Sequence, residues 1–186
     1  MPKSDHNAAH YFIETHLEAG RGEAIAFIEA ASGKRISYTT LSANSSKVAG
    51  ALTKAGIKRE ERAAILMLDS IDYVEVFWGC LKAGVIAVPI NTLLASAVYD
   101  TILSDSRASC LFISASLLQV VKPVLAKNDH IRKVIVVGDH PLEDGFESYQ
   151  TFTKGAPELV AVAVSCLLYT SPSPRDRGCS RMPSSS

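Results

Sequence analysis

Apolar residues recur along the chain with two spacings, one typical of amphipathic helices and one typical of buried strands. Apolar positions three or four residues apart predict helices at residues 8–19, 41–55, 71–81, 95–103 and 117–125. Short apolar runs predict buried strands at residues 63–68, 85–90, 110–113 and 134–137. From residue 41 to residue 137, the two kinds of segment alternate.

This alternation predicts βαβ units. The expected fold class is therefore α/β, a doubly wound parallel sheet with helices on both faces. Ahead of this region, residues 24–29 and 35–38 are expected to form a β-hairpin. Beyond Gly138 the pattern weakens to a loop, a short helical stretch near Tyr149 and one more strand at residues 160–164.

Glycines are expected to end several of the helices. Gly56 and Gly84 each follow a Lys-Ala pair, the pattern of a helix C-terminus with a cation near its negative end. This account of Lys54 and Lys82 is simpler than phosphate binding. The stretch 20–22, Gly-Arg-Gly, lacks the third glycine of a dinucleotide-binding loop and precedes a strand, so we expect it to end the first helix.

The bulk properties of the chain indicate one globular domain. Its 186 residues include 19 Lys and Arg against 19 Asp and Glu, so no net charge favours nucleic acid as a partner. The N-terminus lacks the apolar stretch of a secretory signal, and the longest nearly unbroken apolar run, residues 159–169, is too short to span a bilayer. A cytoplasmic protein without a membrane partner is expected.

No residue emerges as catalytic, cofactor-binding or metal-binding. Cys80 and Cys110 lie in apolar segments without an evident histidine partner, which predicts two core residues. His6 and His10 stand four residues apart, but no carboxylate or cysteine lies beside them at ligand spacing. The phosphate loop G-x-x-x-x-G-K-[ST] and the nucleophile elbow G-x-S-x-G are both absent from the sequence.

Two aspartates remain as candidates at a strand-to-helix turn. Asp69 and Asp72 flank the start of the helix predicted at residues 71–81, where an active-site carboxylate could lie. Aspartate at a helix start is an ordinary capping residue that also complements the helix dipole. We therefore expect capping at both positions.

The last residues differ in character from the rest. Residues 166–186 are rich in serine and proline, lack periodicity and resemble the translated read-through of a sequencing adapter. We expect two regions: residues 7–165, which carry the fold, and residues 166–186, a non-native tail that packs against nothing.

Several segments resemble the adenylate-forming, AMP-forming acyl-CoA synthetases and ligases. Residues 36–41, Ile-Ser-Tyr-Thr-Thr-Leu, and 49–52, Ala-Gly-Ala-Leu, resemble an early family segment. Residues 81–91, Leu-Lys-Ala-Gly-Val-Ile-Ala-Val-Pro-Ile-Asn, resemble the signature K-A-G-x-x-x-V-P-[IVL]-[ND]. The stretches 7–12, 69–73, 89–94 and 105–108 look most like benzoate-CoA ligases and their hydroxybenzoate relatives.

The resemblance implies a parent enzyme that joins a small aromatic carboxylate to CoA through an acyl-adenylate, using ATP, CoA and Mg²⁺. It also implies that the Ser/Thr/Gly-rich phosphate loop would follow shortly after Val164, with the acyl pocket, the CoA pocket and the adenylation lysine beyond it. The expected chain is thus the N-terminal part of the AMP-dependent synthetase/ligase domain, binding no cofactor itself and inactive. The alternative is a small non-catalytic α/β module that binds a nucleotide or a protein.

Overall fold

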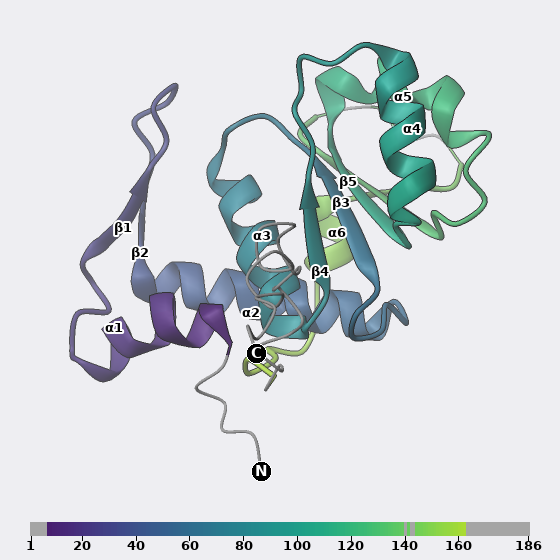
Figure 1. The fold of residues 1–186 in the computed structure, drawn as a ribbon. Coiled ribbons are helices and arrows are strands. Elements are labelled where there is room, and N and C mark those ends of the chain that lie inside the picture. The colour runs from purple at the N-terminus through teal and green to yellow at the C-terminus, as the bar shows by residue number, and fades with distance from the viewer. Residues whose placement is uncertain (1–6, 140, 142–143, 163–186) are drawn as a thin grey trace, which may run out of the picture.

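The computed structural model describes residues 7–139, 141 and 144–162, and its centre is a five-stranded parallel sheet (Figure 1). The strands lie in the order β4-β3-β5-β6-β7, and every neighbouring pair is parallel. Their bounds are β3 Arg62–Leu66, β4 Ile86–Pro89, β5 Cys110–Ser114, β6 Lys133–Val137 and β7 Phe146–Ser148.

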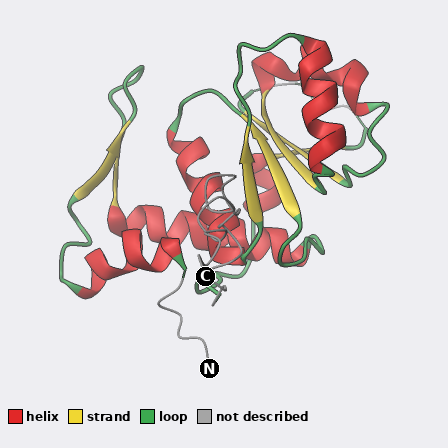
Figure 2. Ribbon diagram, viewed as in Figure 1, coloured by secondary structure: helices red, strands yellow, loops and turns green. Residues whose placement is uncertain are grey.

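Helices cover both faces of this sheet, as the alternating pattern predicts (Figure 2). One face packs against α2 Tyr38–Lys54, α3 Ile71–Ala83 and α6 Tyr149–Thr153. The other face packs against α4 Ser96–Ser106 and α5 Leu118–Leu125, which follows the short 3₁₀ turn η3 Ala115–Leu117. The predicted doubly wound α/β class is confirmed.

Residues of one strand alternate between these two cores because successive side chains point to opposite faces of a sheet. In β3, Ala63 and Ile65 pack on the α2–α3 side, whereas Ala64 and Leu66 pack on the α4–α5 side. All four side chains are fully buried. A strand buried on both faces must be apolar at every position, which explains why these strands appear in the sequence as continuous apolar runs.

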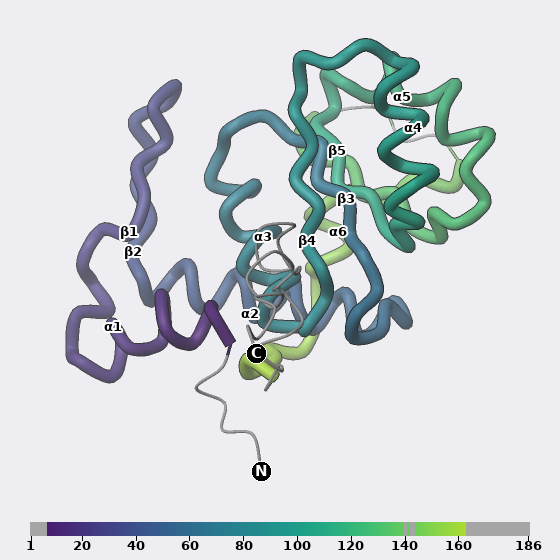
Figure 3. The backbone as a smooth tube through the Cα atoms, viewed as in Figure 1, coloured from purple at the N-terminus to yellow at the C-terminus, as the bar shows by residue number. Residues whose placement is uncertain are grey.

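The N-terminal part lies outside the sheet and carries a projecting hairpin (Figure 3). The π-helix η2 His10–Glu14 leads into α1 Thr15–Glu18, and Gly20 follows with a positive φ of 71°. Strands β1 Ile25–Ile28 and β2 Arg35–Ser37 then pair antiparallel, as predicted. The predicted helix end at Gly20 and the predicted hairpin are both confirmed.

The helix ends match the predictions at both glycines and, for the helix dipole, at Asp72, but not at Asp69. Gly56 and Gly84 follow α2 and α3 with φ values of 75° and 71°, a left-handed conformation that glycine adopts without steric cost. At the start of α3 the capping residue is Ser70, whose hydroxyl accepts a hydrogen bond from the Tyr73 backbone N–H at 3.2 Å. The predicted capping role of Asp69 is therefore wrong, and Asp72 lies in the first turn of the helix.

Two further differences concern the last described residues. Strand β7 is absent from the prediction because Phe146–Ser148 is only three residues long and does not form an apolar run. Residues 160–162 form no strand although they are valine-rich, because Val160 is exposed and the Val162 N–H bonds to a helix carbonyl. Residues 163–164 and the predicted tail at 166–186 lie outside the described residues. Within the described part of the chain, no helix is long and apolar enough to cross a membrane.

Helices α2 and α3 approach closely at Gly79. A Cβ atom at this position would lie 2.5 Å from Cβ of Val48 and 3.0 Å from the carbonyl oxygen of Ser45. Real Cβ atoms essentially never lie that close to another heavy atom. The absence of a side chain at residue 79 thus sets the spacing of the two helices.

Gly79→Ala should destabilise the fold by about 1–3 kcal/mol, because an added methyl group forces the two helices apart. Urea unfolding of the purified chain would measure the loss. In the double variant Gly79→Ala/Val48→Gly the Cβ and Cγ1 atoms of residue 48 are removed and make room for the methyl group, so its total loss should fall below the sum of the two single losses. Strict additivity would contradict the proposed close contact.

Candidate functional site

The strand order identifies the edge of the sheet where a ligand would bind. In an open parallel sheet, ligands bind at the carboxyl ends of the strands, where the chain reverses its direction of winding. Helix α3 connects β3 to β4 on one face and α4 connects β4 to β5 on the other, so the winding reverses between β3 and β5. At this point the Leu68 N–H donates a hydrogen bond to Oγ of Ser114 at 2.9 Å, which joins the loop after β3 to the end of β5.

A hollow of about 330 Å³ lies at the carboxyl ends of β3 and β4. Its polar groups are the Asp69 carboxyl, the Tyr73 phenol, the Asn91 amide and the Thr92 hydroxyl, and Met67, Pro89 and Ile90 supply its apolar wall. Burial, and then the nearby Asp69, raise the pKa of Tyr73. The phenol thus stays protonated and can donate a hydrogen bond at neutral pH.

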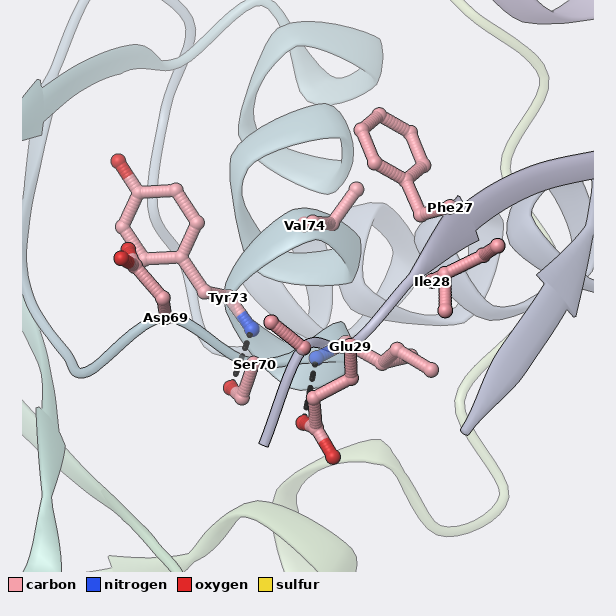
Figure 4. A pocket seen from close by; sticks show the side chains of 9 residues that line it. Phe27, Ile28, Glu29, Asp69, Ser70, Tyr73 and Val74 are labelled. Atoms are coloured by element: carbon pink, nitrogen blue, oxygen red, sulfur yellow. Dashed lines mark hydrogen bonds between the residues drawn. The ribbon is translucent and has the colours of Figure 1, made fainter. Parts of the chain in front are cut away.

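A second hollow of about 310 Å³ separates the hairpin from α3 and shares Asp69 and Tyr73 with the first (Figure 4). Its wall is mostly apolar and includes Phe27, Ile28 and Val74. The close-up shows Asp69 and Tyr73 at one side of this hollow and Phe27 and Ile28 at the other. The two hollows make the start of α3 the main concave surface at this edge.

Glu29 ties the hairpin to the start of α3. Its carboxylate accepts a hydrogen bond from the Ile71 backbone N–H at 3.2 Å and another from the Ser32 hydroxyl. These two bonds, the Ser32 bond first, lower the pKa of Glu29. A negative charge at this position also complements the positive end of the α3 dipole.

Glu75 is a buried carboxyl on the face of the sheet that α6 covers. Its two oxygens accept hydrogen bonds from Nδ2 of Asn44 at 2.7 Å and from the Tyr149 hydroxyl at 2.8 Å, and the residue is buried. Burial raises the pKa of Glu75 more than these two bonds lower it. The group links α2, α3 and α6 beneath the sheet, away from both hollows.

Lys82 lies in the last turn of α3, where the sequence predicts a cation, but its side chain is buried. Its side chain is 1% exposed, and Nζ lies 2.6 Å from Oε1 of Glu14 in the N-terminal helix. The ammonium also donates to the carbonyl and hydroxyl oxygens of Ser42 and to the hydroxyl of Ser46, at 2.9 to 3.0 Å. Burial lowers the pKa of Lys82, and the bond and charge of Glu14 oppose that shift. Lys54, in contrast, is exposed in the last turn of α2, where the sequence predicts a cation.

The other candidate residues from the sequence do not line either of these two hollows. Cys80 and Cys110 are fully buried, and burial raises the pKa of the Cys80 thiol to about 12 and that of Cys110 well above its ordinary value, so the predicted core role is confirmed. His10 lies in η2, and His6 is outside the described residues. Among the residues that the structure describes, no group of three or more His, Cys, Asp or Glu could hold a metal ion.

Sequence reasoning missed Tyr73, Asn91 and Thr92 as lining residues of the edge. Asn91 and Thr92 directly follow β4, and a polar pair after a buried strand is a usable signal for the carboxyl edge of a sheet. Glu75 was also missed. No spacing rule marks a single glutamate within a helix as buried.

The signature segments of the sequence lie at structurally defined places in this architecture. Lys82, Ala83 and Gly84 form the end of α3, and the Val-Pro pair closes β4 beside Asn91. A sequence pattern for the family described as "AMP-binding enzyme" matches residues 14–173, which is most of the chain. The chain belongs to the AMP-binding enzyme family.

Two of the relatives within this family are aromatic-acid ligases. The chain is 36% identical over 141 residues to the 4-hydroxybenzoate--CoA/benzoate--CoA ligase of Rhodopseudomonas palustris, covering 76% of this chain and 26% of that protein. It is 34% identical over 134 residues to the benzoate--CoA ligase of Thauera aromatica, covering 72% of this chain and 25% of that protein. The chain thus spans about a quarter of the length of these relatives.

Solved structures of the same family share the fold. The anthranilate CoA ligase AuaEII in complex with anthranoyl-AMP superposes with a TM-score of 0.78 at 28% identity, over 87% of this chain and 31% of that one. A benzoate CoA ligase from Burkholderia xenovorans LB400 gives 0.74 at 29% identity, over 86% of this chain and 31% of that one. Most of the fold described above is therefore shared with part of each of these ligases.

The raised pKa of Glu75 predicts a pH-dependent loss of stability. The folded state holds the Glu75 proton more tightly than the unfolded state, so the unfolding free energy falls as pH rises from about 4.5 through the folded-state pKa. Glu75→Gln removes this titration, and Tyr149 can reverse its hydroxyl to accept from the new amide. In urea unfolding, the variant should gain stability relative to wild type as pH rises from about 4.5 through the folded-state pKa of Glu75.

Glu18→Gln serves as a control for this measurement, because Glu18 is exposed at the end of α1. The control gives the baseline for replacing an exposed glutamate by glutamine. A difference between Glu75→Gln and wild type that does not change with pH would contradict a raised pKa at Glu75.

The Lys82–Glu14 pair predicts an asymmetric response to substitution. Glu14→Leu leaves a buried ammonium without its counter-charge, whereas Lys82→Met leaves a carboxylate that is 22% exposed and can be hydrated. Glu14→Leu should therefore cost at least about 1 kcal/mol more than Lys82→Met in thermal or urea unfolding. Lys54→Met, the same substitution at an exposed lysine, should stay within about 0.5 kcal/mol of wild type. Equal losses for Glu14→Leu and Lys82→Met would argue against burial of the charge.

Proposed function

We propose that this chain is the N-terminal part of an AMP-forming CoA ligase whose substrate is a small aromatic carboxylate such as benzoate. The observation that supports the proposal is the family match combined with identity of 34–36% to two benzoate-CoA ligases over about three quarters of the chain. Long-chain-fatty-acid--CoA ligase FadD13 of Mycobacterium tuberculosis also matches at 35% identity, but over only 56% of the chain. The wider coverage favours the aromatic class.

In the proposed reaction, a carboxylate oxygen of the substrate attacks the α-phosphorus of ATP, and pyrophosphate leaves. The CoA thiol then attacks the acyl carbonyl of the acyl-adenylate and displaces AMP, with the thiol proton lost to solvent or a base. Both steps need charge stabilisation around the phosphates and the carbonyl oxygen. Mg²⁺ offsets phosphate charge in such reactions, and the described residues include no cluster suited to hold it, so we assign no metal ligand among them.

The proposed role of this chain in the parent enzyme is to build the first sheet and its carboxyl edge. We assign residues 7–165 to the N-terminal part of the AMP-dependent synthetase/ligase domain and residues 166–186 to a non-native tail. The edge residues Asp69, Tyr73 and Asn91 offer hydrogen-bonding groups, but the residues that line the hollow at the ends of β3 and β4 include no Ser, Cys, His or Lys. We therefore propose that the catalytic groups, the phosphate loop and the acyl and CoA pockets belong to later parts of the parent protein.

A pyrophosphate-release assay with ATP, Mg²⁺ and benzoate tests this proposal on two proteins, the 186-residue chain and the longer protein encoded by the parent gene. The short chain should release pyrophosphate at the no-enzyme background rate, because it lacks the groups that position and stabilise the transition state. The longer protein should turn over benzoate and form benzoyl-CoA when CoA is added.

Turnover by the short chain above background would overturn the proposed inactivity. A folded longer protein that turns over fatty acids but not aromatic carboxylates would overturn the proposed substrate class.

A further inference from the structure

The last described residues, 156–162, run across helices α2 and α3 without forming secondary structure of their own. Pro157 lies against Gly50 of α2, where a Cβ atom would overlap the Pro157 carbonyl oxygen. The Leu159 N–H then donates to the carbonyl oxygen of Ser46 in α2 at 3.1 Å. Gly50 lies within the early family segment at residues 49–52.

The backbone N–H and the carbonyl oxygen of Val162, at the end of residues 156–162, both form hydrogen bonds. Its N–H donates to the carbonyl oxygen of Lys82 at 2.9 Å, and its carbonyl oxygen accepts from Nδ2 of Asn7 at 2.8 Å. The second proton of the same amide goes to the carbonyl oxygen of Leu81 at 2.8 Å. Asn7 therefore bridges the end of α3 to the last described residue.

Asn7 is itself fixed in place. The residue is 1% exposed, and its Oδ1 accepts a hydrogen bond from the Ala9 backbone N–H at 2.9 Å at the start of the N-terminal helix. Glu14, which lies five residues after Ala9 in the same helix, forms the ion pair with Lys82. The N-terminal helix is thus anchored to α3 at two points, and the main chain of Lys82 and the side chain of Asn7 hold Val162 from two sides.

We infer that Asn7 and Lys82 are positioning residues for nucleotide binding in the parent enzyme, acting through the chain that follows Val162. The inference rests on the proposed function, in which the phosphate loop follows shortly after Val164. A loop that cradles phosphates with backbone N–H groups needs a fixed starting point, and a misplacement of about 1 Å can cost about a hundredfold in rate.

Asn7→Asp in the full-length parent protein tests the inference. The substitution keeps the size of the side chain and the acceptor for the Ala9 N–H, but it places a carboxylate oxygen against the carbonyl oxygens of Leu81 and Val162. We expect the Kd of Mg²⁺-ATP, measured by calorimetry without carboxylate, to rise about tenfold or more. The KM of benzoate at saturating ATP should change much less.

Asn128→Asp is the matched control, because Asn128 is also a buried asparagine whose amide donates to a helix carbonyl, that of Val124 at 2.9 Å. It lies between α4 and α5 on the opposite face of the sheet. Both variants should lose thermal stability, but Asn128→Asp should keep the Kd of Mg²⁺-ATP within about twofold. Equal stability losses with an unchanged ATP Kd for Asn7→Asp would overturn the inference.

Asn7→Ser decides the question if Asn7→Asp does not fold. Serine still accepts from the Ala9 N–H but is too short to bridge both carbonyls, and it should raise the ATP Kd severalfold; an unchanged Kd would overturn the inference. A wild-type parent that binds Mg²⁺-ATP but does not turn over aromatic carboxylates would refute only the proposed substrate class. The ATP Kd of the variants would still test the role of Asn7. A wild-type parent that does not bind Mg²⁺-ATP would overturn both.

Discussion

Helix α3 can lie against helix α2 only because residue 79 has no side chain, and the rest of the described structure is arranged around this contact. Val48 of α2 fills the space that a Cβ of residue 79 would occupy. Once the two helices are this close, Ser42 and Ser46 of α2 come within hydrogen-bonding distance of the Lys82 ammonium on α3. Three further parts of the structure pack on this helix pair: the N-terminal helix, the sheet face above α3, and residues 156–162.

The buried charge of Lys82 bears on which position the N-terminal helix takes. Its pKa is lowered by burial, so the ammonium is costly in this position, and it is tolerated because Glu14, Ser42 and Ser46 surround it with acceptors. A hydrophobic residue at this position could pack as well, but it would not select one position of the N-terminal helix. We propose that this selection is the reason for the lysine, since it also determines where Asn7 lies.

Most of the fold could be predicted because its strands and helices differ so clearly in apolar spacing. Strands such as β3 and β5 are buried on both faces, so burial itself produces the continuous apolar runs. Strand β7 lies at the sheet edge and is half-buried throughout, so it leaves no such run. The opposite error occurs at residues 160–162, where a strand is predicted but absent. A Val-Ala-Val stretch is typical of a strand, but here the Val162 N–H bonds to a helix carbonyl instead.

The candidate site could be predicted less well, because it depends on contacts between residues far apart in sequence. Lys54 and Lys82 occupy identical Lys-Ala-Gly stretches, yet one is exposed and the other buried, since only α3 has the N-terminal helix against its last turn. The hydrogen bonds of Asn7 to Leu81 and Val162 span 74 and 155 residues. No local pattern encodes such partners, whereas the family resemblance did locate the segments that contain them.

We propose that this chain is the scaffold of a larger adenylate-forming enzyme and not a complete binding module. Sequencing the parent gene past the codon for Val164 distinguishes the two. For a scaffold we expect an open reading frame that continues at once into a Ser/Thr/Gly-rich phosphate loop and then through the remaining three quarters of a ligase of the relatives' length. A native stop codon soon after Val164, or a long continuation without such a loop, would contradict it.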